Sequence, residues 1–255
     1  MFTYLPENEE RFRDYRLVWE DNFERDGALD SARWYIENGN RWANNEAQAY
    51  TDRLKNVRVE KGQLVISALR EDYMERNYTS ARINTRGKKS FMYGYFEIEA
   101  KLPEAVGTWP AFWFMPEDFP AVRWPLCGEI DMMEHSLRRK EEIFYSLHSE
   151  HHNHANPNTT QHSTRVLKKG CLTEYHKYGM EWTEDYIEYF YDGESVCRYD
   201  KADEGTDDLT LCWPYDKPYY MIINVAVGGG MGGPINDDEL PCDMYVNYVR
   251  AYEKK

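Results

Sequence analysis

The stretch 93-YGYFEIEAKL-102 decides the fold class of this chain. From Tyr95 to Leu102, apolar side chains alternate with polar or charged ones. Such a period of two is typical of a β-strand with one face against a core, because successive side chains point to opposite faces. One face would carry Phe96, Ile98, Ala100 and Leu102, and the other Tyr95, Glu97, Glu99 and Lys101.

Segments with strand-like composition recur on both sides of this stretch. Residues 56–69 predict a hairpin that turns at Lys61 and Gly62, and residues 143–148, 186–191, 219–227 and 244–252 predict further strands. An apolar stripe of helical period is not sustained anywhere, although residues 204–211 suit one short helix. Because no linker, repeat or low-complexity run divides the sequence, we expect residues 1–255 to form a single all-β domain, an antiparallel sandwich or barrel.

Composition limits the functions open to the chain. With 42% hydrophobic and 30% charged residues, its 255 residues can bury a sizeable core, which excludes a disordered protein. The net charge of −14 disfavours nucleic acid and anionic membranes as partners but is compatible with a neutral substrate. The 21 tyrosines and 8 tryptophans suit pleated strands and also stacking on sugar rings.

The N-terminus and the cysteines bear on the compartment. A basic head followed by an apolar segment is missing, so the chain is expected to be cytoplasmic unless a signal peptide has been removed, in which case it is extracellular or periplasmic. The five cysteines are widely spaced and odd in number, which argues against a zinc site and a complete disulfide framework. Buried thiols are expected, with one bridge as the alternative.

The main chemical signal is an acidic cluster in 128-GEIDMMEHS-136. Glu129 and Asp131 are two residues apart and share a strand face. Glu134 is five residues from Glu129, so a regular strand would place it on the opposite face. One extra residue at Met132 and Met133, a β-bulge, would return it to the first face.

Three carboxyl groups on one concave surface suit glycoside hydrolysis. The retaining mechanism uses one carboxyl as nucleophile and a second, about 5–5.5 Å away, as acid/base. Crowding of like charges raises a carboxyl pKa and so keeps the acid protonated, and Asp131 would tune that proton. The alternatives are a solvated acidic strand face and a calcium site, although calcium loops usually carry Gly and Asn among their acids.

These residues resemble the E-x-D-x-x-E signature of glycoside hydrolase family 16 in its bulged form. Further similar blocks run in order from about Leu17 to Tyr252: 42-WANNEAQAYT-51, 78-YTSARINT-85, 93-YGYFEIEAKLP-103, 107-GTWPAFWFMP-116, 175-YHKYGMEWTEDYIEYFYDG-193, 219-YYMIINVAVGGGMGG-233 and 244-MYVNYVRAY-252.

The resemblance implies a concanavalin-like β-jelly roll, a sandwich of two curved antiparallel sheets with a cleft across the concave one. It implies Glu129 as nucleophile, Glu134 as acid/base and Asp131 as supporting acid. The blocks look most like laminarinase-type endo-β-1,3-glucanases, some of which act on mixed-linkage glucan. A galactan hydrolase of the agarase or carrageenase kind, a transglycosylase and a non-catalytic β-glucan-binding protein are the alternatives.

The same resemblance and the aromatic content indicate substrate-binding positions. The polysaccharide or oligosaccharide would contact Asn45, Arg82, Trp109, Trp113, Trp124, His135, His148, Asn153 and Gln161. For Trp113, between two phenylalanines, core packing is an equal alternative, and for His135 a structural role on the other side of the strand stays open. The chain is expected to act as a monomer.

Two features raise the question of a metal. The segment 145-YSLHSEHHNHANPNTTQ-161 is rich in histidine, and His148, Asn153 and His154 resemble a cleft-lining stretch of laminarinases, which is favoured over a metal. A structural calcium is found in some family members, and its ligands would correspond to Glu20, Gly62 and Asn247. No cofactor is expected to be required. The glycines at 228–233 lack a phosphate-loop pattern and predict a tight loop at the cleft edge.

Overall fold

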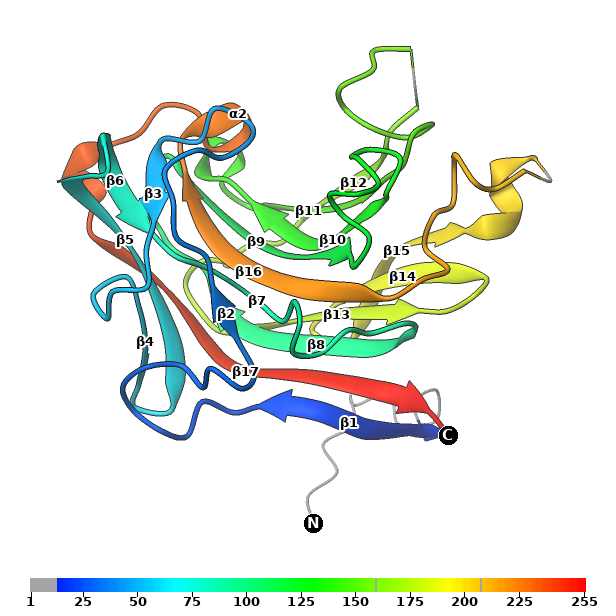
Figure 1. Ribbon diagram of the computed structural model, residues 1–255, viewed down its shortest axis with the longest axis horizontal. Coiled ribbons are helices and arrows are strands. Elements are labelled where there is room, and N and C mark those ends of the chain that lie inside the picture. Colours follow the sequence, from blue (N-terminus) through cyan, green and yellow to red (C-terminus); the bar gives the residue numbers. More distant parts are fainter. Residues whose placement is uncertain (1–12, 159, 207) are drawn as a thin grey trace.

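A computed structural model describes residues 13–158, 160–206 and 208–255. The first twelve residues, on which the expectation about a signal peptide partly depends, lie outside this range. Two curved sheets pack face to face (Figure 1), which confirms the all-β sandwich.

The larger sheet has ten strands, all antiparallel to their neighbours except the parallel pair β3 and β6. Its main path runs β15-β14-β13-β8-β17-β5-β6-β3, with β1 beside β17 and β4 beside β5. The bounds are β1 Tyr15–Asp21, β3 Gln48–Tyr50, β4 Val57–Glu60, β5 Gln63–Tyr73, β6 Arg76–Ser80, β8 Gly94–Lys101, β13 His176–Trp182, β14 Tyr186–Tyr191, β15 Glu194–Asp200 and β17 Cys242–Lys254.

The smaller sheet has seven strands in the order β12-β11-β10-β9-β16-β7-β2. The bounds are β2 Tyr35–Ile36, β7 Arg82–Asn84, β9 Thr108–Pro116, β10 Glu129–His135, β11 Glu142–His148, β12 His162–Leu167 and β16 Tyr219–Val227. Short helical turns lie in connections: η1 Leu137–Arg139, η2 Lys201–Glu204, α2 Gly229–Gly232 and η3 Asp237–Glu239.

The core between the sheets follows the predicted alternation. On β8, Phe96, Ile98 and Ala100 are buried in the main apolar cluster. The opposite face of β8 is also covered: Tyr95 is 1% exposed in a small cluster with three other aromatic residues, and Glu97 is 4% exposed. The buried Glu97 carboxylate accepts hydrogen bonds from the hydroxyls of Tyr95 and Tyr248, which offset its loss of water.

The predicted turn at Lys61 and Gly62 is confirmed. Both residues have a positive φ, 54° and 75°, as a two-residue hairpin turn of the primed type requires, and β4 pairs with β5. The helix predicted at 204–211 is wrong. A single helical turn, η2, ends at Glu204 because Gly205 takes a left-handed conformation with φ 66°, and the described residues beyond it are not helical.

All five cysteines lie in the described part of the chain and are free, and Cys127, Cys171 and Cys212 are buried. The preference for unpaired, mostly buried thiols is confirmed. Among the described residues, no helix has the length and apolar character needed to cross a membrane.

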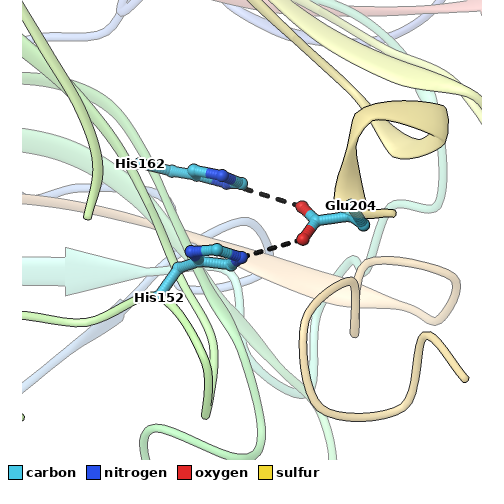
Figure 2. A group of neighbouring side chains, drawn as sticks. All are labelled: His152, His162 and Glu204. Carbon is cyan, nitrogen blue, oxygen red and sulfur yellow. Dashed lines mark hydrogen bonds and ion pairs between the residues drawn. The ribbon is translucent and has the colours of Figure 1, made fainter. Parts of the chain in front are cut away.

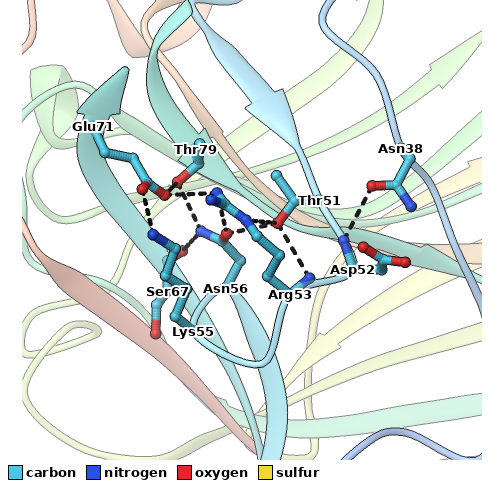
Figure 3. A network of polar contacts seen from close by, with 9 residues as sticks. All are labelled: Asn38, Thr51, Asp52, Arg53, Lys55, Asn56, Ser67, Glu71 and Thr79. Carbon is cyan, nitrogen blue, oxygen red and sulfur yellow. Dashed lines mark hydrogen bonds and ion pairs between the residues drawn. The ribbon is translucent and has the colours of Figure 1, made fainter. Parts of the chain in front are cut away.

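A polar network connects β5, β6 and the segment that follows β3 (Figure 3). Asn56 is fully buried and donates to Thr79 Oγ1 at 2.9 Å, while its Oδ1 accepts from Thr51 Oγ1 at 2.6 Å. Glu71 on β5 accepts from Arg53 Nη2 at 2.6 Å, and it also accepts from Thr79 and Lys55. These bonds connect the segment after β3 to β5 and β6, and so hold the 42–51 segment against the sheet.

Candidate active site

Strand β10, which lies between β11 and β9 in the smaller sheet, carries the acidic cluster on a β-bulge. On one side Asp131 lies opposite Trp113 and Met133 opposite Phe112, so the pairing with β9 gains one residue between Asp131 and Met133. The pairing with β11 shifts between Asp131 and Glu134 as well. The bulge predicted at Met132 and Met133 is therefore present.

The bulge separates two sets of side chains. Ile130, Met132 and Met133 are all 0% exposed and belong to the core between the sheets. Glu129, Asp131 and Glu134 line one cleft on the opposite face. Glu129 and Glu134 are five residues apart and yet lie on one face, because Met132 and Met133 both point into the core.

Gly128 fixes the start of this strand. It has φ 85°, and a Cβ built on it would lie 2.3 Å from the Tyr219 hydroxyl oxygen. That hydroxyl is itself held by hydrogen bonds to the carbonyl oxygens of Cys127 and Pro214. Only glycine combines this backbone conformation with so close an approach, so Gly128 sets where Glu129 enters the cleft.

Burial and crowding raise the pKa of all three carboxyl groups. Burial, reinforced by the charge of Asp131, raises the pKa of Glu129 to about 8. Burial also raises the pKa of Glu134 to about 7, with Glu129 adding to the effect and His148 opposing it. The pKa of Asp131 is raised well above its usual range, first by burial and then by the charge of Glu134. At neutral pH the three interacting carboxyl groups therefore retain protons between them.

Two neighbours contact the carboxyl groups directly. His148 Nε2 lies 3.1 Å from Asp131 Oδ2, and the closest polar atoms of Glu129, Asp131 and His148 are all within 4.8 Å of one another. The Trp109 indole N–H donates to Glu134 Oε1 at 2.9 Å. The cluster is thus surrounded by groups that can orient each carboxyl and stabilise its charge.

The cleft wall on β9 is built by alternation. Trp109, Ala111, Trp113 and Met115 line the cleft, whereas Phe112 and Phe114 are 0% exposed in the core. Trp113 therefore lines the cleft, and it also packs against the buried cluster that contains Met115 and Ile222.

On one side of the carboxyl groups, the cleft has an aromatic and guanidinium wall, which we call the Trp113 side. The Arg82 guanidinium carbon lies 4.6 Å from the centre of the Trp113 ring, and Arg82 Nε is 3.0 Å from Glu37 Oε1. Trp124 also lines this side. The sequence prediction placed Arg82, Trp113 and Trp124 together, and the structure does bring them together.

On the other side, which we call the Phe144 side, Asn45, His148 and Gln161 line the cleft together with Phe144 on β11. Gly230 and Met231 of the glycine-rich segment close its edge, as the tight-loop prediction expected. Glu129, Glu134 and Trp109 line both sides, so the carboxyl groups lie where the two sides meet.

Two predicted substrate-binding residues lie outside the cleft. His135 is 0% exposed, and its Nδ1 is 2.9 Å from the carbonyl oxygen of Glu142, because it points to the core side of β10. Asn153 is 2% exposed and organises its loop by donating to the carbonyl oxygens of Ser149 and Glu150. The prediction of direct substrate contact is corrected for both; His154, next to Asn153, does line the cleft.

The sequence analysis missed a polar group on the Trp113 side. Glu46 accepts from Gln48 Nε2 at 2.7 Å and from the Tyr50 hydroxyl at 3.3 Å, and burial raises its pKa. Asn224 on β16 donates to the Tyr50 hydroxyl at 3.2 Å and accepts from Trp113 Nε1 at 2.7 Å. In the sequence, the two-residue spacing of Glu46, Gln48 and Tyr50 indicated that these side chains share a strand face. Nothing in the sequence indicated that Asn224 on β16 would contact them.

The residues predicted to bind calcium do not fit a calcium ion as they are arranged. The Glu20 carbonyl oxygen accepts a hydrogen bond from the Arg33 guanidinium, a cation where the metal would lie. The Asn247 amide is engaged by Gln63 and Glu99. Glu20 pairs across the strands with Arg250, three residues along β17 from Asn247. No step below involves calcium.

Comparison with known proteins agrees with this geometry. The family described as Glycosyl hydrolases family 16 matches residues 38–250. A beta-glucanase of Rhodothermus marinus is 39% identical over 93% of this chain and 85% of its own length. The solved laminarinase from Rhodothermus marinus superimposes with a TM-score of 0.89 at 38% identity, over 94% of this chain and 97% of that one.

A third similar protein has a sugar in its active site. It is a mutant of SCLam, a non-specific endo-beta-1,3(4)-glucanase, co-crystallised with 1,3-beta-D-cellotriosyl-glucose and presenting 1,3-beta-D-cellobiosyl-glucose at the active site. Its TM-score is 0.86 at 37% identity, over 94% of this chain and 95% of that one.

Proposed function

Since this chain belongs to glycosyl hydrolases family 16, and is an endo-β-glucanase of the laminarinase-like kind, we propose that it cleaves internal β-1,3-glucosidic bonds with retention of configuration. Its substrates would be laminarin-type glucans and, with them, mixed-linkage β-glucans. One observation carries the proposal: Glu129, Asp131 and Glu134 line the same cleft through the bulge of β10.

In the first step, Glu134 would donate its proton to the glycosidic oxygen while a Glu129 oxygen attacks the anomeric carbon. The C–O bond to the leaving sugar breaks, and an ester joins the remaining sugar to Glu129. The raised pKa of Glu134, about 7, keeps its proton available for donation, because burial disfavours the loss of the proton. The pKa of Glu129 is about 8, so Glu129 attacks in those molecules in which it has lost its own proton.

In the second step, the Glu134 carboxylate would remove a proton from water, whose oxygen attacks the same carbon and releases the sugar from Glu129. Asp131 would share a proton with Glu129 and orient the Glu129 carboxyl group for attack and release. A sugar hydroxyl in place of the water would give transglycosylation with the same residues, and this is the second candidate reaction.

The cleft walls support a glucan chain that crosses both sides of the carboxyl groups. Trp113 and Trp124 present aromatic rings on one side, and Phe144 with Gln161 lies on the other. Such rings suit pyranose faces, and a cleft that is open at both sides suits cleavage within a chain. Action as a single-domain monomer without a required cofactor is part of the same proposal.

The testing experiment follows product stereochemistry and substrate range together. Fresh products from laminari-oligosaccharides should show the β-anomer first by NMR, and an α product would overturn retention. Laminarin, barley mixed-linkage glucan, agarose and carrageenan should be compared in parallel by reducing-sugar release. Short oligomers from laminarin are expected, whereas cleavage of a galactan with silence on both glucans would overturn the substrate.

A further inference from the structure

Besides the catalytic cluster, the described residues hold a second compact group of metal-ligating side chains (Figure 2). It consists of His152 in the loop between β11 and β12, His162 at the start of β12, and Glu204 at the end of η2. These residues are separated by up to 52 positions in the sequence. The fold alone brings them together.

The ligand atoms converge on one point. His152 Nε2 is 2.8 Å from Glu204 Oε2, and His162 Nδ1 is 3.7 Å from Glu204 Oε1. All the candidate ligand atoms lie within 4.8 Å of one another. Two ligand atoms that are each about 2.1 Å from a tetrahedral zinc ion are about 3.4 Å apart, so the two observed separations bracket the required one.

Two of these atoms are buried without a hydrogen-bond partner among the described residues. They are Glu204 Oε1 and His162 Nδ1. The Glu204 side chain is only 3% exposed, and the two histidine side chains are 16% and 21% exposed. A buried carboxylate oxygen without a partner is costly, and a bound cation would satisfy it.

The orientation of His152 also suits a metal ligand. Its Nδ1 lies 2.8 Å from the carbonyl oxygen of Thr160, which can only accept a hydrogen bond, so Nδ1 carries the proton. In this structure Nε2 donates to Glu204 Oε2 at 2.8 Å, and loss of that proton to solvent would free the Nε2 lone pair for the ion. Metal-bound histidines are held in their tautomer by an outer contact of the kind that Nδ1 makes.

We propose that His152 Nε2, His162 Nδ1 and a Glu204 carboxylate oxygen bind one Zn²⁺ ion. Two imidazole nitrogens and one carboxylate oxygen are a common zinc ligand set, with water at the fourth position. Calcium and magnesium are disfavoured because they take oxygen ligands. Binding requires the two rings to tilt from their present stacking, in which their centres are 3.8 Å apart.

The ion would hold the loop at 149–161 against the segment that follows β15. That loop carries His154, and Gln161 precedes His162 directly; both line the cleft. Zinc would thus stabilise the cleft wall on the Phe144 side without contacting the reacting atoms. Its expected effects are on thermal stability and on KM for long glucans rather than on kcat.

The test measures metal binding directly and so does not depend on the proposed reaction. The full chain is stripped with a chelator, dialysed and titrated with Zn²⁺ by calorimetry, and Co²⁺ is added separately for its visible spectrum. Glu204→Gln and His162→Gln each remove one ligand. His176→Gln is the matched control, because His176 also pairs with a carboxylate, Asp192, at 2.8 Å. Glu129→Gln controls for binding at the catalytic cluster, which could itself attract an ion.

One zinc ion per chain is expected, with the d–d bands of a tetrahedral cobalt site. Affinity should fall more than tenfold in Glu204→Gln and in His162→Gln, and should be unchanged in His176→Gln and Glu129→Gln. Thermal stabilisation by Zn²⁺ should disappear in the first two variants alone. Three results would each overturn the proposal: equal zinc affinity in wild type and both ligand variants, loss of the ion in Glu129→Gln, or no binding at micromolar zinc. Because either ligand variant suffices, misfolding of one, detected by circular dichroism, leaves the test intact.

Discussion

Trp109 donates its indole N–H to Glu134 Oε1 over 2.9 Å, from the strand next to the one that carries the glutamate. Burial raises the pKa of Glu134 to about 7, and this hydrogen bond acts in the opposite direction because it stabilises the charged carboxylate. Trp109 therefore limits how far the pKa of the proposed acid rises.

Replacing Trp109 by Phe should move the alkaline limb of the kcat profile to higher pH, because the carboxylate loses a donor. We expect kcat to fall less than tenfold at the optimum. Trp113→Phe is the matched control: its indole N–H bonds Asn224 rather than a catalytic carboxyl, so KM should rise while the alkaline limb stays in place. Identical pH profiles for wild type and Trp109→Phe would remove the tuning role of Trp109.

Glu129→Gln should abolish turnover of laminarin, by about 10⁴-fold or more, while leaving oligosaccharide binding within a few-fold of wild type. The reason is that an amide cannot form the glycosyl ester. In Glu129→Ala, added azide should attack the anomeric carbon from the face that Glu129 occupied and give an α-glycosyl azide. A β-azide from this variant, or retained turnover in Glu129→Gln, would exclude Glu129 as nucleophile.

Asp131→Asn should lower kcat by about 10–100-fold and move the acidic limb to lower pH. After burial, the charge of Asp131 is the largest factor that raises the pKa of Glu129, and asparagine removes it. Asp118→Asn, which breaks an ion pair with Lys217 away from the carboxyl cluster, should leave the profile unchanged. If Asp131→Asn also leaves the pH profile unchanged, Asp131 does not tune its neighbours.

Glu134→Gln should reduce activity by about 10²–10⁴-fold and stabilise the folded protein at alkaline pH. A carboxyl whose folded pKa, about 7, exceeds its unfolded value contributes stability below about pH 4.5 and loses that contribution as the pH rises through 7. The Tm advantage of the variant should therefore grow by several degrees between pH 5 and pH 8.

The matched control for that measurement is Glu60→Gln. The Glu60 side chain is 44% exposed, and a hydrogen bond and the charge of Arg58 lower its pKa, so its removal should give no gain at pH 8. Scanning calorimetry at pH 5 and pH 8 measures the Tm differences of both variants from wild type. A Tm difference for Glu134→Gln that shrinks as the pH rises would contradict the raised pKa.

Gly128→Ala should destabilise the protein by more than the about 1–2 kcal/mol that a left-handed conformation costs, because its Cβ would also collide with the Tyr219 hydroxyl. Gly193→Ala has a similar φ, 82°, in a turn where no described atom lies within 4 Å of the added carbon. Gly193→Ala should therefore lose only the stability that the left-handed conformation costs. Urea unfolding of the two variants measures the difference, and equal midpoints would show that the close approach is unimportant.

Local pattern predicted the all-β class and the common face of Glu129, Asp131 and Glu134, whereas their proposed catalytic roles came from the family resemblance. The alternation at 93–102 depends on the period of a strand, and the bulge follows from the parity of the spacing between Glu129 and Glu134. Neither inference needs to know which strands are neighbours. The helix predicted at 204–211 was wrong because Gly205 adopts a left-handed conformation that composition alone did not indicate.

What only the tertiary structure decided is which side chains meet. Tyr50 contacts Asn224 although the two residues are 174 positions apart, and Glu204 reaches His152 across 52 positions. Likewise, the raised pKa values of Glu129 and Glu134 come from burial, which depends on the whole sheet. The sequence by itself determined the strands and the common face of the three carboxyl groups, since these obey local periodicity. The cleft walls and the histidine–glutamate cluster depend on strand order and loop packing, which bring together residues that are far apart along the chain.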